Sequence, residues 1–170
     1  RLQPGLVLSL LNDLDQINYS DPGKSPEIIV KISTFLNRFL FEWKEELIPL
    51  QLDIQITNDF LEIHKLAAGE RFRSNLVASG NLKPFVIPPF LLLPFLNDAV
   101  KLIYGCNESF ESNVLIRGEK GYLLYSFTFW SETAFPLKQV PEVEMIRKRL
   151  NFAYPGKYRL SVSTDENFSV

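Results

Sequence analysis

Hydrophobic residues recur at spacings of three and four along two stretches near the start of the chain. The first stretch, residues 5–18, has its apolar positions at Leu6, Val7, Leu10, Leu11, Leu14 and Ile17. The second, residues 26–47, has them at Ile28, Ile29, Ile32, Phe35, Leu36, Phe39, Leu40, Trp43 and Leu47. Such spacing predicts two amphipathic helices, the second with Ser25 as N-cap and with Pro49 beyond its end. A turn-forming segment, residues 19–24, joins them, so we expect an antiparallel helical hairpin.

The next segment is compatible with two kinds of element. Leu50, Leu52, Ile54 and Ile56 alternate as in a strand, yet apolar residues continue at helical spacing beyond Ile56. We therefore predict a helix over residues 50–66. The remaining pattern predicts a strand at 71–79, a helix at 88–103, a hairpin of strands 113–117 and 122–129, a helix at 143–154 and a strand at 158–163. This order is typical of an α+β fold: an α/β sandwich with helices on one face of a mixed sheet, preceded by the hairpin.

Composition narrows the possible functions. The chain has 170 residues with 18 basic and 20 acidic side chains, which gives no basic surface for nucleic acid. One Cys and one His exclude a disulfide framework and any site that needs two histidines. The longest apolar run, residues 85–96, is interrupted by prolines and is too short to span a membrane. The chain starts at Arg1, so we expect it to be a piece of a longer protein.

Four segments, in order, match the motifs of one known family. Residues 2–12 resemble I-N-P-H-F-L-F-N-S-L-N, residues 60–72 resemble Y-L-E-I-Q-K-x-R-F-G-x-R-F, and residues 87–102 resemble I-P-P-L-L-L-Q-P-L-V-E-N-A-I-K-H. Residues 146–150 and 154–158 resemble the helix and turn that close the family's domain. On these motifs the chain resembles the LytS-type sensor histidine kinases, in which a phosphoacceptor helix region precedes a GHKL-type, or Bergerat-like, ATPase domain.

The resemblance implies a domain organisation and a set of partners. Residues 1–48 would form the phosphoacceptor-like hairpin, through which the family dimerises, and residues 49–170 would form the GHKL sandwich, including the connecting helix 50–66. The implied partners are a response regulator or an active partner kinase, in a homo- or heterodimer, with no nucleic acid. The implied location is the cytoplasmic domain of a bacterial protein anchored in the inner membrane through a missing N-terminal region.

The position that aligns with the phosphoacceptor histidine is Gly5, which has no side chain and cannot act as a nucleophile. The only histidine, His64, aligns with a Gln of the family on a different helix. We expect His64 to be a partly exposed, inert side chain rather than a substitute acceptor. No residue is therefore predicted to be catalytic.

The nucleotide site also departs from the family pattern. The magnesium-binding asparagine of the family aligns with Asp98, preceded by Asn97 and followed by Lys101, and these three residues would form a relic cofactor site. Asp98 is a weak candidate Mg²⁺ ligand, although an ordinary polar face of a buried helix explains the same residues. The glycines of the family's phosphate loop fall at Val140 and Glu142, which oppose a polyphosphate by shape and by charge.

Three functional hypotheses follow. The first is a pseudokinase that signals through protein contacts and holds no cofactor. The second is an ATP- and Mg²⁺-binding kinase that phosphorylates a partner's histidine in trans through Asp98 and Lys101. The third is a sensor of a small ligand, with a pocket formed by Phe127, Phe129 and Trp130; the same aromatic residues could instead fill the space of a lost nucleotide.

Overall fold

A computed structural model describes residues 4–42, 45–91, 93–103, 109–131 and 141–161. Its helices are α1 (Pro4–Ser20), α2 (Ser25–Glu42), α3 (Leu50–Ala68), α4 (Leu93–Ile103) and α5 (Pro141–Ala153), with short 3₁₀ turns at Pro22–Lys24 and Gly69–Arg71. Its strands are β1 (Ile48–Pro49), β2 (Phe72–Gly80), β3 (Val86–Ile87), β4 (Phe110–Glu119) and β5 (Tyr122–Ser131).

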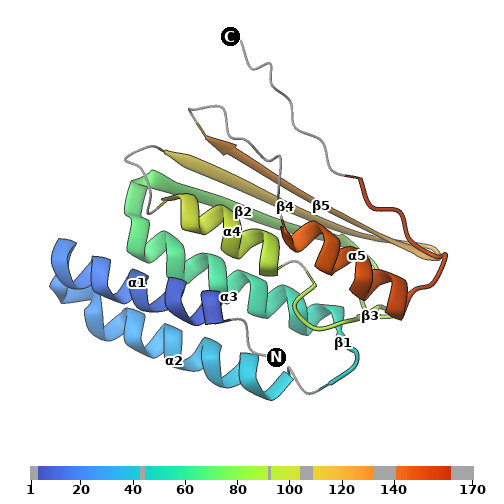
Figure 1. Ribbon diagram of the computed structural model, residues 1–170, viewed down its shortest axis with the longest axis horizontal. Helices are drawn as coiled ribbons and strands as arrows, with labels where there is room; N and C mark the ends of the chain where they lie inside the picture. The colour runs from blue at the N-terminus through green and yellow to red at the C-terminus, as the bar shows by residue number, and fades with distance from the viewer. Residues whose placement is uncertain (1–3, 43–44, 92, 104–108, 132–140, 162–170) are drawn as a thin grey trace, which may run out of the picture.

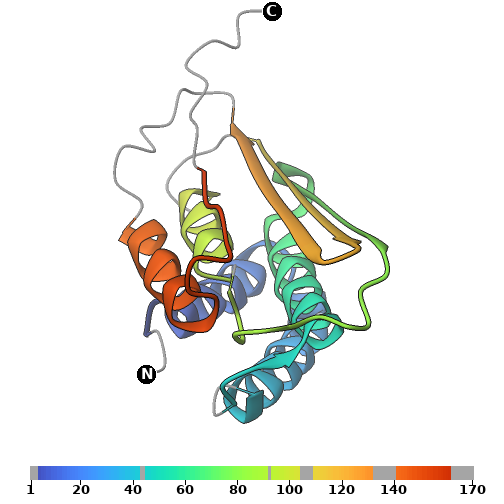
Figure 2. The ribbon, with the colours of Figure 1, turned by 90° about the vertical axis from the view of Figure 1, so that its right-hand side faces the viewer.

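The main sheet has three strands in the order β2-β4-β5 and is mixed. β2 and β4 are parallel, with Phe72 opposite Phe110, and β4 and β5 are antiparallel, with Phe110 opposite Ser131. Figures 1 and 2 show the helices gathered on one side of this sheet. Along β4 every second side chain is buried beneath the helices, because successive side chains point to opposite faces of a strand. The predicted α+β fold with a mixed sheet is confirmed.

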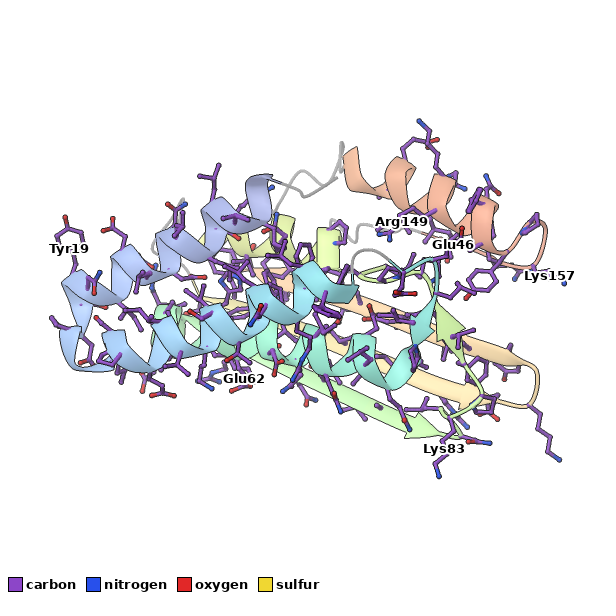
Figure 3. The ribbon with its side chains drawn as sticks, turned by 90° about the horizontal axis from the view of Figure 1, so that it is seen from below. Tyr19, Glu46, Glu62, Lys83, Arg149 and Lys157 are labelled. Atoms are coloured by element: carbon purple, nitrogen blue, oxygen red, sulfur yellow. The ribbon has the colours of Figure 1, made fainter. Side chains whose placement is uncertain are left out.

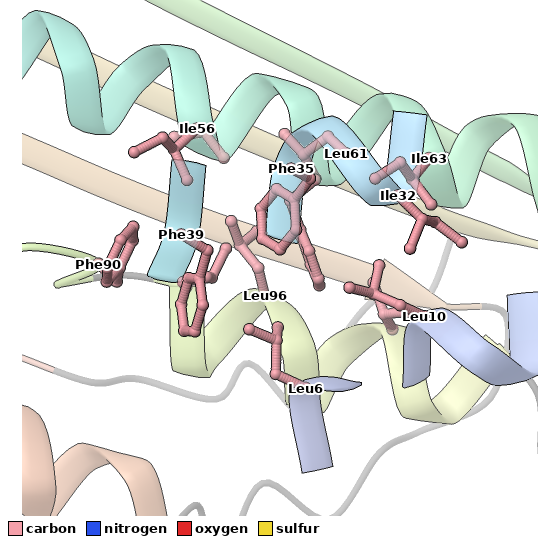
Figure 4. Packing of buried hydrophobic residues seen from close by; sticks show 14 of the residues in the cluster. Leu6, Leu10, Ile32, Phe35, Phe39, Ile56, Leu61, Ile63, Phe90 and Leu96 are labelled. Carbon is pink, nitrogen blue, oxygen red and sulfur yellow. The ribbon is translucent and has the colours of Figure 1, made fainter. Parts of the chain in front are cut away.

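The two N-terminal helices lie side by side and run in opposite directions, as predicted (Figure 1). Their apolar stripes pack against α3 and α4 in a single core. Figure 4 shows Leu6 and Leu10 of α1 close to Phe35 and Phe39 of α2. The ring centroids of Phe35 and Phe60 are 5.8 Å apart, and those of Phe39 and Phe90 are 4.4 Å apart. The hairpin therefore shares its core with α3 and with the segment before α4.

The ends of α2 differ from the prediction. Ser25 is the first residue of the helix rather than a cap, and its hydroxyl donates to Oδ1 of Asn18 at 2.5 Å. The described part of α2 stops at Glu42, and residues 45–47 are not helical. The prediction of a helix through Leu47 is wrong because residues 45–47 lead directly into strand β1. In this strand Ile48 pairs with Ile87, and just beyond it the amide of Leu50 donates to the carbonyl of Phe85 at 2.9 Å.

Two predictions near the sheet are also wrong in part. α4 begins at Leu93 rather than at Pro88, because Phe90 has a positive φ of 57°, which no helix accommodates. Residues 158–161 contain no strand, and residues 162–163 of that predicted strand lie outside the described residues. Gly118 lies within β4, and a Cβ atom at this position would lie 2.5 Å from the carbonyl oxygen of Asn81. The turn itself is Lys120–Gly121, with a φ of 88° at Gly121.

Candidate functional site

The residues predicted to form a relic nucleotide site lie on α4. Leu93, Leu96 and Val100 recur at spacings of three and four, and this apolar stripe buries one face of the helix. Lys101, near the end of α4, is exposed. Asp98 also lies in α4, but its side chain is outside the described part of the structure, so its role as an Mg²⁺ ligand stays a prediction.

Asn97 is directed towards α1. Its side chain is 3% exposed, and its Oδ1 accepts a hydrogen bond from the Ser9 hydroxyl at 2.8 Å. Ser9 is also 3% exposed, and its Oγ lies 2.8 Å from the carbonyl oxygen of Leu6. The amide oxygen of Asn97 therefore satisfies a buried hydroxyl inside the protein, and this contact holds α1 against α4.

The aromatic residues of β5 divide between the two faces of the sheet. Phe129 stacks on Phe110 with ring centroids 5.5 Å apart, and Phe127 lies 6.5 Å from Phe129. Both rings pack against the core, whereas the next residue, Trp130, is 45% exposed. The three side chains thus do not line one common pocket. Val140 lies outside the described residues, and Glu142 lies in α5 with its side chain outside them.

Gly5 lies in the first turn of α1. The structure therefore places the position that aligns with the phosphoacceptor on a helix, but glycine brings no side chain that could attack a phosphate.

His64 is fully buried, which contradicts the expectation of a partly exposed side chain. It lies on α3, and its Nδ1 is 2.5 Å from Oδ2 of Asp13 on α1; both side chains are 0% exposed. The ring of Phe60 meets the imidazole edge to face at 4.3 Å. The expectation was wrong because α1 covers this face of α3, which the periodicity of α3 alone does not reveal.

Asp13 is the partner that sequence reasoning missed. Burial raises the pKa of its carboxyl group, and the neighbouring His64 opposes this rise through its charge and a hydrogen bond. A sequence signal did exist, because Asp13 lies three residues after Leu10 and four before Ile17, on the buried stripe of α1. A carboxylate on such a stripe requires a buried partner.

Asp53 forms a second buried polar site that sequence reasoning missed. It lies in the first turn of α3 and is 1% exposed, and its Oδ1 accepts a hydrogen bond from the amide of Phe90 at 2.7 Å. Arg149 of α5 donates to the carbonyl oxygens of Phe90 at 3.2 Å and Pro89 at 2.5 Å. These bonds hold Phe90 in its left-handed conformation and join α3, α5 and the segment before α4.

The electrostatics of this second site follow from its burial. Desolvation raises the pKa of Asp53 to about 6, while the Phe90 amide and the charge of Arg149 act to lower it. Desolvation lowers the pKa of Arg149, and the carboxylate of Asp53 opposes that change. Burial and the charge of Asp53 both raise the pKa of Tyr125 on β5. The arrangement is a structural clamp with one titratable carboxyl group near neutral pH.

Among the described residues, no cluster of three or more His, Cys, Asp or Glu side chains could hold a metal ion. In the same part of the chain, every helix is too short or too polar to cross a bilayer.

Comparison with known proteins gives a distant similarity to a class of signalling protein. No family model matches the chain. Sensor histidine kinase BtsS of Escherichia coli K12 is 21% identical over 170 residues, a match that covers 97% of this chain. The BtsS proteins of Escherichia coli O6:H1 and Shigella flexneri match to the same extent. The chain spans only 30% of the length of these relatives. It is therefore distantly related to a sensor histidine kinase.

Proposed function

We propose that this chain is a two-component signalling protein of the LytS type that keeps the architecture of a kinase region and acts through protein contacts without phosphorylating a histidine. The distant similarity to sensor histidine kinase BtsS supports the class of protein. One observation supports the loss of histidine phosphorylation. Gly5 occupies the acceptor position, while the side chain of the only histidine is 0% exposed and is paired with Asp13.

The buried position of His64 bears directly on the chemistry. A phosphoacceptor histidine needs one ring nitrogen free to attack the terminal phosphate of ATP in line. Nδ1 of His64 lies against the carboxylate of Asp13, and the imidazole is enclosed by α1 and Phe60. Access for ATP would require α1 to leave α3, and this would expose a buried polar pair together with the core around it.

Weak or absent nucleotide binding is part of the proposal. Asn97, which aligns beside the family's magnesium-binding asparagine, bonds to Ser9 rather than facing solvent. Val140 and Glu142 replace the glycines that allow backbone to approach phosphate. We therefore propose no resident cofactor.

The hairpin supplies the surface for protein contacts. The hairpin exposes several large apolar side chains: Leu8 and Leu11 on α1, and Ile29, Val30, Leu40 and Phe41 on α2. Apolar side chains exposed along two adjacent helices are typical of an interaction surface. We propose that these side chains form the contact through which the chain dimerises with a second copy or with an active partner kinase. A response regulator then receives the signal.

Radiolabelled ATP tests this proposal. The purified 170-residue chain is incubated with labelled ATP and Mg²⁺, and acid-labile label on the protein is measured. We expect none. Label on the wild-type chain would refute the pseudokinase assignment. The variant Gly5→His restores an acceptor side chain alone, so label on this variant but not on the wild type would show that a working ATP site survives.

Calorimetry separates the pseudokinase from a kinase acting in trans. We expect the chain to bind Mg²⁺-ATP no more tightly than millimolar. A tighter affinity that is lost in Asp98→Ala, with Asp15→Ala on α1 as the control, would favour a nucleotide-binding enzyme. A small-ligand sensor would instead show a thermal shift with a metabolite and none with nucleotides.

A further inference from the structure

A cleft lies at the opposite end of the molecule from the α1–α2 connection. It has a volume of about 630 Å³ and is formed by residues 45–47, by Pro88 and Pro89, and by the end of α5. Figure 3 shows Glu46 and Arg149 at this end of the molecule. The volume falls within the ~300–1,000 Å³ range of small-molecule sites, so the exposure of the lining side chains decides which class of ligand the cleft suits.

The walls of the cleft are held together by hydrogen bonds. Arg149 binds the carbonyl oxygens of Pro89 and Phe90, and the hydroxyl of Tyr154 donates to the carbonyl of Val86 at 2.5 Å. These bonds fix the end of α5 against the segment that carries the two prolines. The cleft is therefore preformed rather than a gap between independent parts.

Exposed charges of both signs border the cleft, beside the half-buried Arg149. Glu45 and Glu46 lie on one wall and Lys148 on the other, and all three are exposed. Among the described residues, none of the three has an ion-pair partner within 4.0 Å. A ligand with a cation and an anion at its two ends could satisfy both walls.

Apolar side chains also border the cleft, one on each wall. Phe152 is 86% exposed although its ring borders the cleft, and Leu47 on the other wall is 46% exposed. A ring so open to water leaves the cleft too shallow to enclose a small molecule, which usually buries most of its surface. An extended chain that lies along the cleft suits this shape better.

We propose that this cleft binds an extended peptide segment that carries a basic, an apolar and an acidic side chain. The basic residue faces Glu45 and Glu46, the apolar side chain covers Phe152, and the acidic residue faces Lys148. This site is separate from α4, so it goes beyond the proposed signalling function.

Fluorescence anisotropy with two labelled peptides tests the proposal. The first is acetyl-Lys-Ala-Leu-Ala-Asp-amide, and the second replaces its Lys by Gln and its Asp by Asn. We expect the charged peptide to bind roughly tenfold more tightly than the neutral one and to lose affinity as NaCl is raised, because salt screens exposed charges. Equal binding of both peptides, or no binding at millimolar concentration, would overturn the proposal.

Charge reversal locates the site. Glu46→Lys and Lys148→Glu should each weaken binding of the charged peptide about fivefold, and Phe152→Ser should weaken the binding of both peptides. The matched controls, Glu70→Lys and Lys120→Glu, reverse exposed charges elsewhere and should leave binding unchanged. An equal loss in the controls would show that only net charge matters and would contradict the site. No nucleotide is present, so the result is independent of the phosphorylation test.

Discussion

His64 on α3 and Asp13 on α1 form a fully buried pair, with Nδ1 of the imidazole 2.5 Å from Oδ2 of the carboxylate. The pair connects the N-terminal hairpin to the rest of the core through polar atoms rather than through packing alone. Removing one member of such a pair takes from the other its oppositely charged partner inside the core, which costs more than the pair itself contributes.

The first prediction concerns this pair. Asp13→Ala and His64→Ala should each lower the free energy of unfolding by about 3–5 kcal/mol, and the double variant should lose clearly less than the sum. Urea unfolding followed by circular dichroism measures these values. Asp15→Ala, an exposed position on the same helix, should change stability little. Additive losses in the double-mutant cycle would show that the two side chains do not interact energetically.

The second prediction concerns the pH dependence of stability. The pKa of Asp53 is raised from 3.8 to about 6 in the folded chain, so the folded state holds this proton more tightly than the unfolded state does. The contribution of Asp53 is therefore fully present below pH 4 and is lost as the pH rises through 6. Its full size is about 3 kcal/mol.

Comparison with Asp53→Asn isolates that contribution. The carboxyl group of Asp13 also has a raised pKa, so the wild-type curve contains more than one group. Between pH 4 and 7, the variant should lack the part of the decline that belongs to Asp53, whereas Asp15→Asn should follow the wild type. Parallel curves for Asp53→Asn and the wild type would contradict the assignment.

The third prediction concerns Arg149. Arg149→Gln removes the guanidinium that donates to the carbonyl oxygens of Pro89 and Phe90. This loss should lower the free energy of unfolding by about 1.5–3 kcal/mol. It also removes the cation that acts to lower the pKa of Asp53, so the loss of stability should extend to higher pH than in the wild type. Arg147→Gln, at an exposed position two residues away, is the control. A lower stability with an unchanged pH profile would mean that Arg149 does not act on Asp53.

The fourth prediction concerns association through the hairpin. Val30 and Phe41 on α2 are 64% and 78% exposed. If this face forms the dimer, Val30→Asp or Phe41→Asp should weaken association roughly tenfold or more, because each change places a charge in an apolar contact. Sedimentation velocity over a range of concentrations measures the effect. Leu124→Asp, on the outer face of the sheet, should leave association unchanged, and an equal effect there would argue against the hairpin.

The elements of this fold follow from the sequence where their causes are local. α3 is predictable because Ile56, Phe60 and Ile63 continue a helical spacing, and the β4–β5 hairpin because Gly121 allows a tight turn. The start of α4 is not predictable in this way. Phe90 is held out of helical conformation by Asp53 and Arg149, which are distant in sequence.

The same limit applies to the site. That Gly5 brings no nucleophilic side chain needs only the identity of one residue. The sequence did not reveal that Asn97 bonds to Ser9, or that His64 is buried against Asp13. Both contacts depend on how α1 docks on α3 and α4, and a spacing pattern within one helix carries no information about its neighbour.

The two kinds of pairing in the sheet have a consequence for the order of folding. β5 reaches β4 across the turn Lys120–Gly121, whereas β2 reaches β4 only after the chain has passed through β3 and α4. Short loops close sooner and lose less chain entropy than long ones. The β4–β5 hairpin should therefore form early, and β2 should add late, together with the helix α3 that precedes it. A chain in which only this hairpin has formed would expose the edge of β4 that pairs with β2, and an unpaired strand edge favours aggregation.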